Sequence, residues 1–230
     1  RRLFRWLDTI NSAKGARAGS LALADQLAAS ATNFLTGVIV GRACAPQEFG
    51  LYMLGFSIVF FAMRLQTALI STPYMVFSPQ LAEDERKKFA GSILVHQLGI
   101  TVLAMVALVV AAIVIRALKT PHGLAEVLFA LTFAIGFILL RELVRNICFS
   151  HLNFMAAFFL DCGIGVLQVF GLLGLTRVGL LAAHSAFLVI GAACGLAVAV
   201  WFFSSGDLLT VRRREVIPTF RRNWQFGRWI

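Results

Sequence analysis

The chain has 230 residues, of which 59% are hydrophobic, and carries a net charge of +10 at pH 7. Together with a mean hydropathy of +0.83, this composition excludes a soluble globular protein, which would expose too much apolar surface. The positive charges are dispersed over short segments beside apolar ones, which argues against nucleic-acid binding through one basic patch.

Six stretches of the sequence are long and apolar enough to cross a membrane as helices. Crossing the hydrocarbon core takes roughly 20 mostly apolar residues, and a segment in lipid must satisfy its own backbone hydrogen bonds. The predicted spans are residues 21–40, 51–77, 92–115, 124–149, 156–175 and 178–206. We therefore expect an all-α polytopic membrane protein whose six-transmembrane-helix bundle occupies residues 21–206.

Residues 1–20 precede the first span and mix basic with apolar side chains, among them Phe4 and Trp6. This composition favours a short helix lying in the cytoplasmic membrane interface. Because Gly15 and Gly19 interrupt the pattern, a plain tether is the alternative.

The first span carries a polar stripe. Gln26, Ser30 and Asn33 recur at helical spacing and share one face of an ideal helix. Asp25 lies on a neighbouring face, where it either pairs with a basic residue or caps the cytoplasmic end of the span. Arg42, at the far end, points away from the stripe on a straight helix.

The second span carries Arg64 near its middle, where a charged side chain costs on the order of 2.5–3.5 kcal/mol by insertion scales. Ser57, Arg64, Ser71 and Ser78 recur every seven residues and are predicted to share one face. Pro73 is predicted to bend the helix. We interpret this face as the wall of a water-filled cavity; the alternative is a structural ion pair between Arg64 and an acid on another helix.

Charged residues also gather where the fourth span ends and the fifth begins. Arg141, Glu142 and Arg145 lie at the end of the fourth span, and Asp161 lies near the start of the fifth. We interpret them as an ion-pair cluster that fastens the two helices, in preference to a substrate contact. Two Gly-xxx-Gly pairs, 37–41 and 191–195, indicate close helix packing.

Most of the 21 Lys and Arg residues lie in the leader, in alternate loops and in the tail. The opposite side has Arg42, Arg116, Lys119 and Arg177. Since cytoplasmic loops carry the excess of Lys and Arg, both ends of the chain are predicted to be cytoplasmic. Residues 207–230 are interpreted as a basic cytoplasmic linker that contacts membrane lipids and leads to a further helix.

No catalytic or cofactor-binding signature is present. The sequence lacks HExxH, Gly-x-Ser-x-Gly and P-loop motifs, and its four cysteines have no metal-ligand spacing. We therefore expect a protein that is not an enzyme and has no cofactor. Polar groups inside the spans are left as the candidate functional residues.

Three parts of the chain carry a family resemblance. The first part comprises Asp25-Gln26-Leu27, Thr32-Asn33-Phe34-Leu35, Gly41-Arg42 and Pro46-Gln47-Glu48-Phe49-Gly50-Leu51-Tyr52. The second part is Arg141-Glu142-Leu143-Val144-Arg145 with Phe149 and Asp161. The third part is Asn223-Trp224-Gln225-Phe226-Gly227-Arg228-Trp229. Together they resemble the polysaccharide-transporter (Wzx-type) flippases of the multidrug/oligosaccharidyl-lipid/polysaccharide exporter superfamily. The likeness covers nearly the whole chain.

The resemblance implies the N-terminal lobe of a two-lobed transporter in the bacterial inner membrane. Such flippases move lipid-linked oligosaccharides on a polyprenyl diphosphate carrier to the outer leaflet by alternating access. By position, Arg42 and Arg64 match the cations that attract the carrier's diphosphate. With the polar residues of the first two spans, the predicted substrate-binding set is Arg64, Arg42, Asn33, Gln26, Ser71 and Asp25.

Two alternatives remain from the sequence. One is a drug or small-molecule exporter of the same superfamily, with acidic residues binding the substrate. The other is a non-transporting membrane scaffold of a polysaccharide-assembly complex, in which the loops and the tail carry the function.

Overall fold

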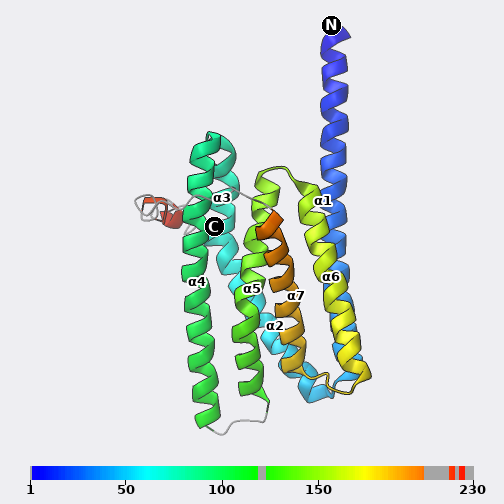
Figure 1. Cartoon of the computed structure of the whole chain (residues 1–230), viewed down its shortest axis with the longest axis vertical. Helices are drawn as coiled ribbons and strands as arrows, with labels where there is room; N and C mark the ends of the chain where they lie inside the picture. The colour runs from blue at the N-terminus through cyan, green and yellow to red at the C-terminus, as the bar shows by residue number, and fades with distance from the viewer. Residues whose placement is uncertain (1, 119–122, 205–217, 221–222, 226–230) are drawn as a thin grey trace.

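The computed structural model describes the backbone of residues 2–118, 123–204, 218–220 and 223–225, with side chains from residue 19 onward in these ranges. Consecutive long helices alternate in direction and lie side by side (Figure 1). The elements are α1 (Arg2–Ala43), α2 (Pro46–Gln66), the π-helical turn η1 (Thr67–Ser71), α3 (Thr72–Phe77), the 3-10 turn η2 (Ser78–Gln80), α4 (Glu83–Ala117), α5 (Leu124–Ser150), α6 (Phe154–Arg177) and α7 (Ala183–Ser204).

Five helical segments in the described ranges are long and apolar enough to cross a membrane. They are Pro46–Gln80, Glu83–Ala117, Leu124–Ser150, Phe154–Arg177 and Ala183–Ser204. The prediction of a helical, multi-pass membrane protein is therefore confirmed, but the count of six is not. The predicted first span lies in α1, whose mean hydropathy is lowered by polar residues such as Asp25, Gln26 and Asn33.

Local sequence signals explain where several helices begin. Pro46 occupies the first turn of α2, where no intrahelical N–H donor is needed. Three acidic residues open α4, next to the positive end of its dipole. The side chain of Asn153 accepts a hydrogen bond from the Ala156 amide at 3.2 Å and caps α6.

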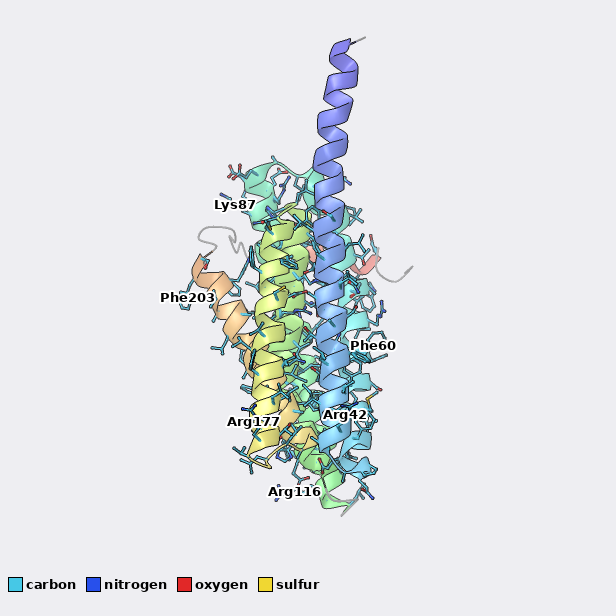
Figure 2. The ribbon with its side chains drawn as sticks, turned by 90° about the vertical axis from the view of Figure 1, so that its right-hand side faces the viewer. Arg42, Phe60, Lys87, Arg116, Arg177 and Phe203 are labelled. Atoms are coloured by element: carbon cyan, nitrogen blue, oxygen red, sulfur yellow. The ribbon has the colours of Figure 1, made fainter. Side chains whose placement is uncertain are left out.

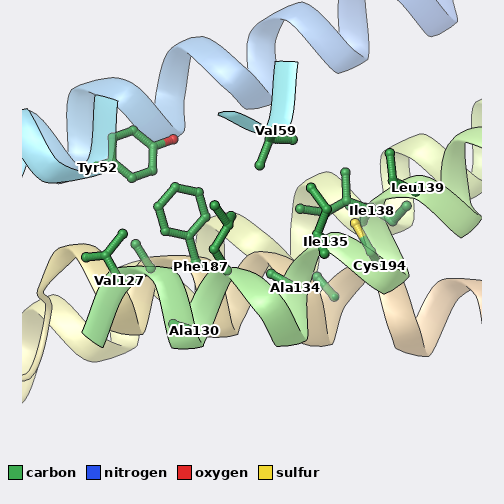
Figure 3. Close-up of a cluster of buried hydrophobic side chains, with 14 of the residues drawn as sticks. Tyr52, Val59, Val127, Ala130, Ala134, Ile135, Ile138, Leu139, Phe187 and Cys194 are labelled. Carbon is green, nitrogen blue, oxygen red and sulfur yellow. The ribbon is translucent and has the colours of Figure 1, made fainter. Parts of the chain in front are cut away.

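Helix α5 is the centre of the bundle. It packs mainly against α4 and α7, and α2 also packs against it, whereas α1 packs mainly against α6. Its apolar side chains Leu131, Ile135 and Leu139 are completely buried. Tyr52 and Val59 of α2 face this helix and Phe187 of α7 across the core (Figure 3). A helix surrounded in this way needs an apolar surface on most of its faces.

The two Gly-xxx-Gly pairs differ in their packing. A Cβ atom on Gly191 would lie 2.7 Å from the Ala134 Cα, and one on Gly195 would lie 3.0 Å from the Phe137 ring. The pair on α7 therefore permits the close approach of α5, as predicted. A Cβ on Gly37 would meet nothing within 4 Å, and one on Gly41 would meet only Phe49 at 3.3 Å.

The prediction that four polar residues of the second span share one face is wrong. Ser57 and Arg64 are exposed, whereas Ser71 and Ser78 are buried. The π-helical turn η1 begins after Arg64 and ends at Ser71, and the amide of Thr72, which follows it, donates to the Thr67 carbonyl five residues back. One extra residue in a turn rotates the following side chains by roughly 100° about the helix axis, which separates the two faces.

The leader does not form a separate helix. Helix α1 begins at Arg2 and continues through Gly15 and Gly19 to Ala43, and its first turns extend beyond the end of the bundle (Figure 1). Most of the predicted linker, residues 207–230, lies outside the described residues. The placement of the leader in the membrane interface and of the linker in the cytoplasm stays a prediction.

Basic residues that the sequence assigns to opposite sides of the membrane lie at opposite ends of the bundle. Arg42, Arg116 and Arg177 gather at one end of the bundle, and Lys87 lies at the other (Figure 2). Lys119, the fourth basic residue assigned to the first of these ends, lies outside the described residues. A bundle whose ends differ in this way has the charge pattern from which membrane orientation is predicted.

Candidate functional site: a buried ion cluster beside a cavity

Helix α5 contributes three charged residues to one buried cluster. Arg141, Glu142 and Arg145 lie within a single turn, and their side chains are 15%, 11% and 15% exposed. Arg141 Nη1 donates to Glu142 Oε2 at 3.3 Å, and Arg145 Nη1 lies 3.6 Å from Glu142 Oε1. The glutamate therefore lies between two cations of its own helix and offsets their mutual repulsion.

Two fully buried aspartates from other helices complete this ion cluster. Asp161 of α6 accepts from Arg141 Nη2 at 2.5 Å and from Arg141 Nε at 3.1 Å, both at Oδ1. Asp25 of α1 accepts from Arg145 Nη2 at 2.6 Å and from Nε at 3.1 Å, both at Oδ2. Such charge-assisted hydrogen bonds are among the strongest in proteins. The ion-pair interpretation is confirmed, and Asp25 pairs with a basic residue rather than capping the helix.

One contact in the ion cluster is ionic without being a hydrogen bond. Arg145 Nε lies 3.1 Å from Asp161 Oδ2, but its single N–H is directed at Asp25. In the described part of the chain, Asp161 Oδ2 and Asp25 Oδ1 accept no hydrogen bond. The ion cluster thus joins α1, α5 and α6, and both of these carboxylate oxygens are buried within it.

A cavity of about 220 Å³ lies directly beside the ion cluster. Its walls come from α1 and α2, with α5, α6 and α7 behind them; we call it the α1–α2 cavity. Arg141 and Asp161 both line it, together with Gln168 and the aromatic residues Tyr52, Phe56, Phe60 and Phe187. Among its lining residues, Asn33 of α1 and Phe60 of α2 are exposed, and we call the side of the cavity at these two residues its mouth.

Helix α1 forms its wall of the cavity because specific contacts hold it on α6. Gln168 Nε2 donates to Thr36 Oγ1 at 2.6 Å. Gly165 lies where any Cβ atom would collide with the Thr32 hydroxyl. Together with the pairing of Asp25, these contacts hold α1 against α6, with Thr32 and Asn33 among the residues that line the cavity.

The segment around η1 is held on α5 by polar contacts of its own. Gln66 Nε2 donates to the Leu139 carbonyl at 2.9 Å, and Asn146 Nδ2 donates to Ser71 Oγ at 3.0 Å. All three of these polar side chains are buried. Ser71 is therefore a helix-packing residue in this structure, although the sequence indicated a substrate-binding role.

The remaining predicted site residues divide into two groups. Asn33 lines the cavity, and Gln26 Oε1 lies 3.5 Å from Arg145 Nη2 at the edge of the ion cluster. Arg42 is exposed at the opposite end of α1 (Figure 2), away from the cavity lining. The structure thus brings Asn33, Gln26 and Asp25 into one region and leaves Arg42 outside it.

Arg64 lies just beyond the cavity mouth. Its guanidinium carbon is 4.7 Å from the centroid of the Phe60 ring, a cation–π contact, and its side chain is exposed. No carboxylate in the described part of the chain lies within ion-pair distance of it. The alternative interpretation, a structural ion pair, finds no support among the described residues.

Sequence reasoning missed several residues at the cavity. From the sequence, Arg141 and Asp161 are predicted to fasten helices, and Gln168, which shares a helical face with Asp161 and Gly165, is predicted to serve helix packing. Tyr52 belongs to a motif that carries the family resemblance, but neither it nor Phe56 is predicted to line a cavity. The aromatic residues carry no signal of a cavity, because any apolar span contains rings of this kind.

No protein-family model matches the chain, and no curated protein sequence matches it.

Proposed function

We propose that the chain is the N-terminal lobe of a flippase that moves a lipid-linked oligosaccharide, carried on a polyprenyl diphosphate, across the bacterial inner membrane. In this proposal a second lobe faces α1 and α2, alternating access moves the substrate, and both ends of the chain are cytoplasmic. The multi-pass helical fold and the resemblance of the sequence support it.

The observation that carries the proposal is the state of Arg64. It lies in the Pro46–Gln80 segment, which is apolar enough to cross a membrane, yet it is exposed and has no acidic partner among the described residues. An exposed, unpaired cation at membrane depth is costly unless it faces water or binds an anion. A guanidinium binds phosphate oxygens through paired hydrogen bonds, so a lipid diphosphate is a suitable ligand.

The acidic residues favour this proposal over an exporter of cationic drugs. Asp161 lines the cavity and Asp25 belongs to the ion cluster beside it, and each is hydrogen bonded to an arginine. A cationic substrate would have to compete with two guanidinium groups that are already in place. Nothing in the described residues favours the scaffold alternative specifically.

The test is complementation of a bacterium that lacks its own polysaccharide flippase, using the complete transporter and its Arg64→Ala variant at matched membrane levels. We expect the parent to restore export and the variant to lose it. Arg116→Ala is the matched control, because it removes another exposed arginine, one that lies at the end of α4. Normal export by Arg64→Ala would remove the proposed role of Arg64.

A further inference from the structure

We infer that the α1–α2 cavity is a subsite for a single neutral sugar ring of the transported lipid, distinct from the phosphate contact at Arg64. This inference rests on the proposed function and assigns the sugar and the phosphate to different residues. Three observations carry it: the size of the cavity, the balance of charge at its wall, and the position of Phe60.

The size of the cavity limits what it can hold. Pockets for drug-sized ligands have volumes of roughly 300–1,000 Å³, and this cavity has about 220 Å³. It therefore has room for one ring, while the rest of an oligosaccharide has to extend through the mouth between Asn33 and Phe60.

The charges at the wall favour a neutral ligand with hydroxyl groups. Arg141 and Asp161 are bonded to each other, so an anion entering the cavity would meet Asp161 and a cation would meet Arg141. Hydrogen-bonding capacity nevertheless remains. A guanidinium has five N–H donors, of which the bonds to Asp161 and Glu142 engage Nε, Nη1 and Nη2 once each.

Asn33 adds an amide beside those donors. Its side chain is exposed and makes no hydrogen bond in the described part of the chain, so it offers one acceptor oxygen and two N–H donors. A sugar hydroxyl both donates and accepts, so neighbouring hydroxyls match a wall that offers both functions. Polar groups of this kind provide specificity for a ligand that satisfies them.

Aromatic rings form the other side of the cavity. Tyr52, Phe56 and Phe60 come from successive turns of α2, and the Phe187 ring of α7 stacks on Tyr52 with centroids 5.3 Å apart. Ring faces carry partial negative charge and suit the weakly positive C–H face of a sugar. Pockets that bind small molecules commonly combine aromatic walls with a few placed polar groups.

Phe60 connects the cavity with the proposed phosphate contact. The ring lines the cavity, and the guanidinium of Arg64 lies over it. A phosphate held by Arg64 would therefore lie beside the mouth of the cavity. This is the arrangement that a sugar bonded directly to a diphosphate requires, because the ring and the phosphate are covalent neighbours.

The test compares two lipids bound to the full chain in nanodiscs: a polyprenyl diphosphate and the same lipid carrying one hexose. We expect the hexose-bearing lipid to bind more tightly. Asn33→Ala should weaken its binding by roughly three- to tenfold, the value of one hydrogen bond, without changing binding of the bare lipid. Ser30→Ala is the matched control, since Ser30 is exposed one turn away on α1 and does not line the cavity.

The outcomes separate this inference from the proposed function. If both lipids bind equally and Arg64→Ala weakens both, the sugar subsite is refuted while the diphosphate contact stands. If neither lipid binds, the proposed function fails and the subsite fails with it. Equal weakening of both lipids by Asn33→Ala would also refute the subsite, because Asn33 would then serve the carrier and not the sugar.

Discussion

The arginines of α5 differ from those of α1 and α2 in burial and in ion pairing. Arg141 and Arg145 are largely buried, and every carboxylate of the ion cluster contacts at least one of them. Arg64 and Arg42 are exposed, and neither forms an ion pair in the described part of the chain. The same side chain thus serves two purposes in one bundle.

The difference follows from the cost of burying a charge. A buried guanidinium is tolerated only when carboxylates and hydrogen bonds replace its water, and the ion pairs of Arg141 and Arg145 hold α1, α5 and α6 together. Arg64 forms no ion pair among the described residues. Its position beside the Phe60 ring of the cavity distinguishes it from Arg42 and makes it the candidate for binding phosphate.

The largest expected effect comes from comparing Arg145→Leu with Arg64→Leu. Arg145→Leu leaves Asp25 buried without its cation and weakens the pairing of Asp161, so we expect a loss of about 3–5 kcal/mol in unfolding free energy. Arg64→Leu should change it by about 0.5 kcal/mol or less, because the residue is exposed. Denaturant unfolding of the chain in detergent micelles measures both, and equal losses would break the comparison.

A double-mutant cycle sharpens the role of the pair that joins α1 to α5. Asp25→Asn and Arg145→Gln should each destabilise the chain, and the double variant should lose less than the two single losses added together. We expect an interaction energy of roughly 3 kcal/mol, at the upper end for contacting residues, because both side chains are buried. A value near zero would mean that other contacts, such as Gln168 with Thr36, hold α1 alone.

A comparison of two glycines, one packed against a neighbouring helix and one facing open space, is expected to give a smaller effect. Gly191→Ala places a methyl group against the backbone of Ala134, and we expect it to cost roughly 2 kcal/mol. Gly37→Ala meets open space and should be neutral or stabilising by up to about 1 kcal/mol, because alanine favours a helix. The thermal unfolding temperatures of the two variants distinguish these cases, and the reverse order would mean that α1 packs where the structure leaves it open.

Several features could be predicted from the sequence because they depend on local composition. Apolar stretches of sufficient length are helices wherever they lie, so the sequence predicts the segments from 46 to 204, although their bounds differ from the observed ones by up to nine residues, as at the start of α4. The ion cluster was also partly predictable, since charged residues that have to be buried need partners of opposite sign. The sequence predicts that Arg141, Glu142, Arg145 and Asp161 form one ion-pair cluster, whereas for Asp25 it leaves open a basic partner or a helix cap, and the structure identifies the partner as Arg145.

The tertiary structure decided what depends on register and on contacts between distant helices. A π-helical turn at Thr67–Ser71 rotated Ser71 into the core and left Arg64 exposed, which no seven-residue repeat reveals. Residues from five helices meet at the α1–α2 cavity, and Asn33 reaches it because Gly165 lets α1 approach α6. Hydropathy and charge are properties of the chain itself, but a cavity exists only between helices, so its residues follow from packing.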